Sequence, residues 1–145
     1  MRSKYGPMGR FAVDIEIVNN EDLVRAKHGF IDASQVRRVT IKGWVDTGAA
    51  YLVLPQSVVD EIGLPLRPKK LKVRYADGRR ATRSEADEAR VFLLGRDGIF
   101  RAIVEPKRDT ALIGAIVLED LDLLIDAKNQ KLYPRDPESV FAEIE

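Results

Sequence analysis

The stretch whose residue types and spacing could do chemistry is Asp46-Thr47-Gly48, a carboxylate, a hydroxyl and a glycine in a row. The ten residues before it, 36–45, are rich in β-branched side chains, so Asp46 is expected where a strand ends and a glycine turn begins. Gly48 permits a positive φ and a close backbone approach, and two small alanines follow it. The pattern predicts a carboxylate at a strand tip, with room beside it for a substrate or another chain.

A second small segment, Ala111-Leu112-Ile113-Gly114, follows about sixty residues later and leads into a helix-like stretch. Asp46-Thr47-Gly48-Ala49, between apolar Trp44-Val45 and Leu52-Val53-Leu54, together with this segment resembles the active-site pattern of retroviral-like (retropepsin-type) aspartic peptidases. Asp-Thr-Gly alone occurs by chance in many chains, whereas the two segments together are fairly specific. The resemblance covers roughly residues 36–133.

The resemblance implies hydrolysis of peptide bonds by two aspartates that hold one water molecule between them. Two carboxylates about 3 Å apart cannot both ionise, so they share a proton and titrate as a pair. The ionised carboxylate takes a proton from the attacking water, while the protonated one donates to the carbonyl oxygen and later to the leaving amine. No metal or other cofactor is implied.

The chain contains a single Asp-Thr-Gly among its 145 residues. Because a lone carboxylate cannot be both acid and base, the resemblance implies a symmetric homodimer in which the two Asp46 side chains meet at the two-fold axis. By the same resemblance Thr47 bonds across that axis and Gly48 makes the turn, so these three are the expected catalytic residues. The alternative is an ordinary strand-ending turn, since all three residue types favour turns.

Several residues are expected to contact the substrate. Trp44 shares a strand face with Asp46 because side chains alternate, so the only tryptophan is either a pocket wall or part of the core. Ala49 leaves room beside the carboxylate. By resemblance, Thr110 and Leu112 line the pocket opposite Trp44.

A hairpin is predicted by the strict alternation of residues 71–75, the Asp-Gly turn and a return through residues 79–83. In the family that the chain resembles, this hairpin is the flap that closes over the substrate and excludes water. Its tip here is Ala76, Asp77 and Gly78, which contains less glycine than the tips of retroviral members. The chain also has Ala50 and Ala115 where retroviral members usually have a paired acid and arginine, and losing both partners leaves no orphan charge.

The hairpin region is strongly basic, with eight lysines and arginines against one acid, Asp77, between residues 67 and 83. The simpler interpretation is a solvated face whose cations protect a strand edge. The alternative is a surface that attracts acidic substrates or an acidic partner segment.

Composition bounds the remaining possibilities. The net charge of +1 gives no indication of nucleic acid or membrane binding, and the lack of cysteine excludes disulfides, thiol nucleophiles and thiolate metal sites. The start of the chain lacks an apolar secretion signal, and no apolar run reaches membrane-spanning length. We expect a soluble cytoplasmic homodimer that acts on a protein or peptide, with no nucleic acid and no membrane partner.

The strand and turn signals predict an all-β, single-lobe retropepsin-like fold, a closed and partly opened-out acid-protease barrel with seven to nine short strands and one or two short helices. We expect a flexible arm at 1–10, the protease domain at 11–133 and an acidic tail at 134–145. In the tail, Asp136-Pro137-Glu138 and the spacing of Val140, Phe141 and Ile144 predict a helix.

Together these observations predict an aspartic endopeptidase of the retropepsin type. The alternative from a different class is a catalytically silent dimeric binding or scaffold module with the same fold, since fold and site need not travel together.

Overall fold

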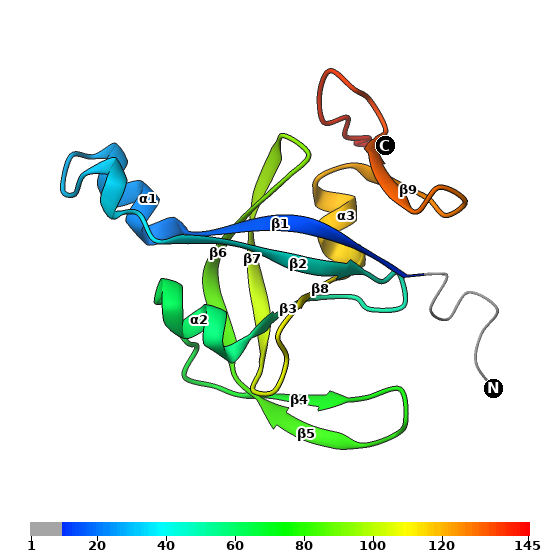
Figure 1. Ribbon diagram of the computed structural model, residues 1–145, viewed down its shortest axis with the longest axis horizontal. Helices are drawn as coiled ribbons and strands as arrows, with labels where there is room; N and C mark the ends of the chain where they lie inside the picture. The colour runs from blue at the N-terminus through cyan, green and yellow to red at the C-terminus, as the bar shows by residue number, and fades with distance from the viewer. Residues whose placement is uncertain (1–9) are drawn as a thin grey trace.

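The centre of the computed structural model is a closed barrel of six strands (Figure 1). Residues 10–145 are described, so the expected arm lies outside the described residues except for Arg10. The strands around the barrel are, in order, β1 (Phe11–Asn19), β2 (Arg38–Val45), β8 (Ala111–Ile113), β3 (Leu52–Pro55), β7 (Arg96–Glu105) and β6 (Glu85–Leu93). The predicted fold class, an all-β single-lobe barrel, is confirmed.

Two smaller sheets lie outside the barrel, each a two-stranded hairpin. They are β4 (Leu71–Arg74) with β5 (Arg80–Arg83), and β9 (Leu123–Asp126) with β10 (Lys131–Pro134). The first is the hairpin predicted from the Asp-Gly turn. In Figure 1 it extends below the barrel.

Short helices follow several of the barrel strands along the chain. Within residues 10–145 they are α1 (Asn20–Lys27), α2 (Gln56–Ile62), α3 (Ala115–Asp120) and the 3-10 turn η1 (Ala33–Gln35). The helix α1 begins where the Asn19 side chain accepts a hydrogen bond from the Asp22 amide, and α2 ends at Gly63 with φ +65°. No helix in this part of the chain has the length and apolar composition needed to cross a bilayer.

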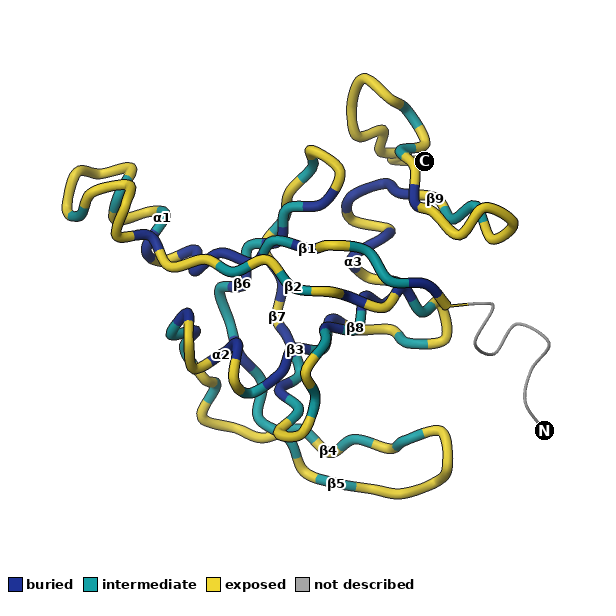
Figure 2. Tube along the Cα trace, viewed as in Figure 1, coloured by how far each residue is buried: buried dark blue, intermediate teal, exposed yellow. Residues whose placement is uncertain are grey.

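The core fills the barrel and the space under α2 and α3. Strands β1 and β2 pair antiparallel from Phe11 with Val45 to Val18 with Arg38, which sends Ile15 and Ile17 into the interior. The largest fully buried side chains include Ile15, Ile17, Leu52, Leu54, Ile62, Ile113 and Leu121. Figure 2 shows the buried segments along the barrel strands, while the β4–β5 hairpin has only exposed and intermediate positions. The barrel is therefore the rigid frame, and the hairpin is held at its edge.

The predicted tail helix is wrong, because side chains of the barrel end bind the backbone of the tail. Arg96 donates to the carbonyl oxygens of Asp136 and Ser139, and Asp122 accepts from the amide of Phe141 at 3.0 Å. These backbone groups are thereby bonded to side chains, and the tail after β10 has no helical turn.

Candidate active site

Asp46 lies at the end of β2, as the sequence predicted. Its amide donates to the carbonyl oxygen of Ile113 at 3.1 Å, because β2 runs parallel to β8 with Val45 beside Ile113. The Asp46 side chain is 27% exposed. A carboxylate is therefore presented at an open end of the barrel by two neighbouring strands.

The turn after Asp46 fixes one oxygen of its carboxylate. The Gly48 amide donates to Asp46 Oδ1 at 2.9 Å, and the Ala49 amide donates to the Asp46 carbonyl oxygen at 3.1 Å. Gly48 is not among the glycines with positive φ, so the expected left-handed turn is absent there. A Cβ at this position would lie 3.2 Å from Asp46 Oδ1. A larger residue at position 48 would therefore crowd the carboxylate, which would have to shift by a few tenths of an ångström.

The start of α3, directly after the second predicted segment, forms hydrogen bonds with the Asp46 loop. The amides of Ala115 and Ile116, in the first turn of α3, donate to the carbonyl oxygens of Ala49 and Ala50 at 2.9 and 3.0 Å. A Cβ at Gly114 would lie 2.7 Å from the Ala49 carbonyl oxygen, which only glycine avoids. Backbone hydrogen bonds therefore join the two segments at the place where retroviral members were expected to use a charged pair.

Thr47 and Ala49 differ in exposure. Thr47 is exposed, with its hydroxyl at the end of the barrel, whereas Ala49 is half-buried by its contact with the start of α3. The loop thus brings the three expected catalytic residues together in one turn, with Thr47 open to a partner.

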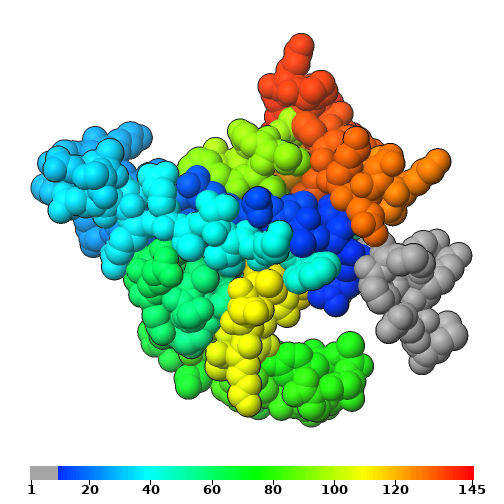
Figure 3. Space-filling model, viewed as in Figure 1, coloured from blue at the N-terminus to red at the C-terminus, as the bar shows by residue number. Residues whose placement is uncertain are grey.

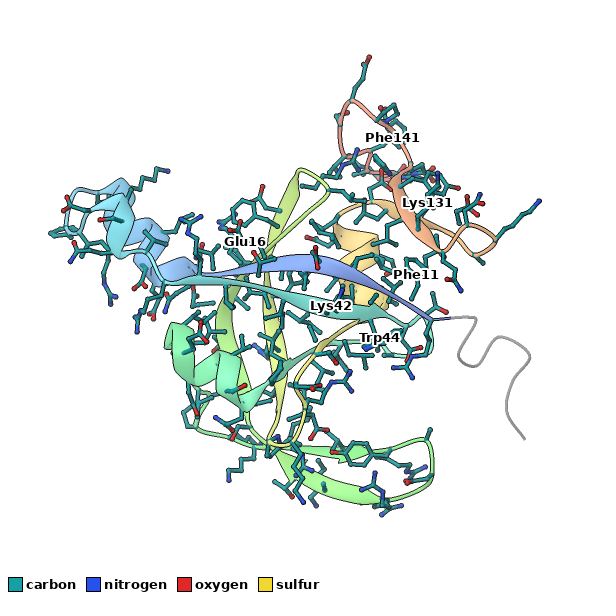
Figure 4. The ribbon with its side chains drawn as sticks, in the orientation of Figure 1. Phe11, Glu16, Lys42, Trp44, Lys131 and Phe141 are labelled. Carbon is teal, nitrogen blue, oxygen red and sulfur yellow. The ribbon has the colours of Figure 1, made fainter. Side chains whose placement is uncertain are left out.

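Trp44 and Leu112 lie side by side. The parallel register pairs Trp44 of β2 with Leu112 of β8, so both side chains are on the same face of the sheet. Trp44 is 36% exposed, which rules out the alternative that it belongs to the core. Figure 4 shows Trp44 at the same end of the barrel as Phe11. The two residues were expected on opposite sides of a pocket, and the structure instead has them as neighbours.

Arg10 lies beside the site, and the sequence did not indicate it. Its Nε is 3.6 Å from Asp46 Oδ2, and its guanidinium carbon is 5.7 Å from the centre of the Trp44 ring. The signal that could have found it is the register of β1 and β2, since pairing of Phe11 with Val45 brings residue 10 next to residue 46.

The predicted flap tip, Ala76, Asp77 and Gly78, forms the exposed turn of the β4–β5 hairpin. Gly78 has φ +87°, and Arg79 donates to Asp77 from its amide at 2.9 Å and from Nε at 2.7 Å. These hydrogen bonds from Arg79 hold the pKa of Asp77 below its usual value. The tip is therefore an ordered turn whose carboxylate is already paired within the hairpin.

Glu105, at the end of β7, anchors the hairpin to the barrel. Tyr75 donates its hydroxyl to Glu105 Oε2 at 2.5 Å, and Arg83 donates from Nε to Oε1 at 2.6 Å. Burial, followed by the hydrogen bond to Glu105, raises the pKa of the Tyr75 hydroxyl. One carboxylate thus holds both arms of the hairpin, a contact that the sequence did not reveal.

A cavity of about 580 Å³ lies between the hairpin and the loop that follows β7. It is lined by Tyr75, Arg79, Arg83, Glu105, Pro106, Lys107 and Arg108. Figure 3 also shows a hollow between the hairpin, in green, and the barrel above it. Four of the lining side chains are cations and one is an acid, so the cavity is electropositive.

The hairpin cations divide into paired and solvated groups. Arg67, Arg79 and Arg83 form ion pairs with acids of the same chain. The exposed cations that form no ion pair with an acid among residues 10–145 are Lys69, Lys70, Lys72, Arg74 and Arg80. The simpler interpretation of a solvated face therefore applies to this exposed group.

Thr110, the last of the expected substrate contacts, lies just before β8. It is half-buried and accepts hydrogen bonds from Arg108 through its carbonyl oxygen at 2.8 Å and its hydroxyl at 3.2 Å. Among residues 10–145, no group of three His, Cys, Asp or Glu side chains is arranged to hold a metal ion.

The family is identified by comparison with known proteins. A barrel with Asp-Thr-Gly at a strand tip, locked by a second glycine segment and faced by a hairpin, defines a retropepsin-like protease fold. The family model described as aspartyl protease matches residues 33–125, which is more than half of the chain. The protein therefore belongs to the aspartyl protease family, and the matched range contains the Asp46 loop, the hairpin and β8. No curated protein matches the chain.

Proposed function

We propose that this protein is an aspartic endopeptidase that hydrolyses peptide bonds through a water molecule held by two Asp46 carboxylates, one from each subunit of a homodimer. The observation that carries the proposal is the Asp46 loop itself. It presents an accessible carboxylate at a strand end of a barrel of the aspartyl protease family, and Gly48 and the start of α3 hold it in place.

The two oxygens of Asp46 suit different tasks. Oδ1 is held by the Gly48 amide at 2.9 Å, so the plane of the carboxylate is set before any substrate binds. Oδ2 has no backbone donor within the loop and lies 3.6 Å from Arg10 Nε. We assign to Oδ2 the approach to the second carboxylate and the water. With one proton shared between the pair, one carboxylate accepts the proton of the attacking water and the other donates to the carbonyl oxygen and then to the amine.

Exposed apolar side chains around the Asp46 loop support a subunit contact there. Trp44 precedes the loop, Tyr51 follows it, and Ile116 is joined to it through the hydrogen bond to Ala50, and all three are exposed. Apolar side chains grouped at one site on a surface are typical of protein contacts. We place the two-fold axis at this loop, so that the exposed Thr47 meets its copy.

The substrate would lie between the loop and the hairpin. We assign contacts to Trp44, Ala49, Thr110, Leu112 and the tip residues Ala76, Asp77 and Gly78. The anchor at Glu105 holds the hairpin near the barrel, and the tip beyond it is exposed and can close over a bound peptide.

The test is cleavage of a diverse peptide pool by the wild type and by Asp46→Asn, from about pH 4 to 7, with the oligomeric state measured by light scattering. We expect cleavage by the wild type and none by the variant. A variant as active as the wild type would remove Asp46 from the mechanism. A wild type that is dimeric and folded, yet cleaves no member of the pool, would favour the silent binding module.

A second measurement tests whether the two carboxylates act together. Equal amounts of wild-type and Asp46→Asn chains are refolded together, and activity is compared with the same total amount of wild type. If only dimers with two Asp46 residues work, about one quarter of the activity remains, as expected for random pairing. Retention of half would mean that each subunit acts alone.

A further inference from the structure

The loop between β7 and β8 carries an arginine, Arg108, whose hydrogen-bond acceptors among residues 10–145 are all neutral. It is half-buried and lines the cavity beneath the hairpin. Its guanidinium donates to the carbonyl oxygen and to the hydroxyl of Thr110, both neutral acceptors. Within residues 10–145, none of its nitrogens forms an ion pair with an acid.

The other arginines of this cavity are different. Arg79 is 2.7 Å from Asp77, and Arg83 is 2.6 Å from Glu105, so both charges are neutralised within the chain. Lys107 is exposed and adds a further positive charge. The cavity therefore keeps a net positive charge, and Arg108 is its least hydrated source.

The electrostatic surroundings of Arg108 support this description. Burial, with the repulsion of Arg10 added to it, lowers the pKa of Arg108, although the guanidinium stays protonated. The charges of Glu105, Asp109 and Asp46 act in the opposite direction, from beyond contact distance. A half-buried charge without a partner lowers stability, and an anion from outside would restore the lost interactions.

The hydrogen bonds of Arg108 also leave suitable donors. Nε and one hydrogen of Nη2 are used by Thr110. Both hydrogens of Nη1 and the second of Nη2 remain, which is the arrangement that receives a carboxylate end-on with two hydrogen bonds. Thr110 thus orients the guanidinium and leaves its outer edge open.

We propose that Arg108 is a specificity residue, which binds the side-chain carboxylate of a glutamate or aspartate of the peptide substrate near the scissile bond. The assignment rests on the proposed peptidase function, since it places the acidic side chain of a peptide substrate in the cavity between the hairpin and the loop that follows β7. We place this subsite beside the reacting centre because the loop that carries Arg108 leads into β8, whose Ile113 carbonyl oxygen accepts from the Asp46 amide at 3.1 Å. The enzyme would accordingly prefer acidic peptide segments.

The test uses pairs of peptides that differ only by glutamate or glutamine at one position near the cleaved bond. For the wild type we expect kcat/KM to be about tenfold to a hundredfold higher for the glutamate peptide, the usual range for a partly desolvated charged hydrogen bond. In Arg108→Gln this ratio should fall to about one, and Arg108→Glu should favour a lysine peptide instead. The matched control is Arg74→Gln on the exposed face of the hairpin, which should keep the wild-type ratio. A wild type that cleaves both peptides equally overturns the proposal.

A binding experiment separates this proposal from the peptidase function. The Asp46→Asn protein, with and without Arg108→Gln, is titrated with fluorescent glutamate and glutamine peptides and followed by anisotropy. Tighter binding of the glutamate peptide that depends on Arg108 supports the subsite even if the wild type cleaves nothing. Equal binding of both peptides overturns it. A preference that follows the free carboxyl terminus, and disappears when that terminus is amidated, overturns the side-chain assignment.

Discussion

Arg37 directly precedes β2, and Arg108 lies in the loop between β7 and β8; both are arginines with exposed surface, but their surroundings differ. Arg37 donates to Asp22 from Nε at 2.8 Å and from Nη2 at 3.1 Å, and its amide donates to the same carboxylate at 3.1 Å. Asp22 is only 5% exposed at its side chain. Among residues 10–145, the hydrogen-bond partners of Arg108 are the neutral oxygens of Thr110 alone.

The two environments shift the pKa values in opposite directions. The hydrogen bond from Arg37 lowers the pKa of Asp22, and the same bond raises the pKa of Arg37. At Arg108, burial lowers the pKa. The paired charges of Asp22 and Arg37 hold α1 against the residue before β2, whereas the half-buried cation Arg108 lowers stability and is available to a ligand. The comparison separates a charge that is paired within the fold from one that we propose binds substrate.

The largest expected effect is the loss of activity on replacing Asp46. Asp46→Asn should lower kcat/KM by about a thousandfold or more, the range for loss of acid–base catalysis, and should change the free energy of unfolding by less than about 1 kcal/mol. Peptide cleavage and urea unfolding measure the two quantities. A large loss of stability with activity retained would show that Asp46 stabilises the fold and does not take part in catalysis.

Replacing Asp22, the partner of Arg37, should change stability and leave activity unchanged. Asp22→Asn is expected to lower the free energy of unfolding by about 2 to 3 kcal/mol, because it removes the charged acceptor of three donors from Arg37. Below the unfolding transition, kcat/KM should be unchanged. Asp14→Asn, on an exposed position of β1, is the control and should have little effect.

The Asp22 contribution also has a defined pH dependence. Its pKa is lower in the folded protein, so the unfolded chain binds the proton first as the pH falls. The stability difference between the wild type and Asp22→Asn should be constant above about pH 5 and should shrink below about pH 4. A difference that grows on acidification would contradict the pairing.

A smaller effect is expected at the hairpin anchor. Glu105→Gln keeps the size of the side chain but removes the charge that Tyr75 and Arg83 share, so the hairpin should open more often. We expect a rise in KM of about threefold to tenfold, and faster hydrogen exchange at the amides of residues 75–79. Glu119→Gln, on the exposed side of α3, serves as the control. Unchanged exchange would show that the anchor does not restrain the hairpin.

The smallest effect should come from the exposed face of the hairpin. Lys72→Gln and Arg74→Gln are expected to change the free energy of unfolding by less than about 0.5 kcal/mol and kcat/KM by less than about twofold. A large loss of activity, recovered by neither salt nor added cations, would make this face part of the substrate site.

The sequence predicted the features that depend on local pattern. The β-branched run before Asp46 placed the carboxylate at a strand tip, and Asp77-Gly78 placed the hairpin turn. Both rest on periodicity and turn chemistry within a few residues. The small size of Gly114 also made it part of the predicted pattern. The sequence did not show that Gly114 packs against the backbone of the Asp46 loop.

Features that depend on distant contacts were not predictable. The position of Arg10 beside Asp46 depends on the register of β1 with β2. The electrostatic interaction of Arg108 with Asp46 depends on the course of the loop after β7. The neighbouring positions of Trp44 and Leu112 follow from parallel pairing with β8, a strand of three residues that is too short to show its partner. The predicted tail helix failed because Arg96 and Asp122 take its backbone groups.

The hydrogen bonds that close the Asp46 loop have a consequence for the order of synthesis. The loop carbonyls of Ala49 and Ala50 need the amides of Ala115 and Ile116, and the Asp46 amide needs Ile113. A nascent chain that has emerged from the ribosome only as far as the hairpin has the Asp46 segment but none of these partners. The loop can close only after residues 113–116 have also left the ribosome. Maturation of the site is thus delayed by the chain's own topology until β8 and the start of α3 have been made.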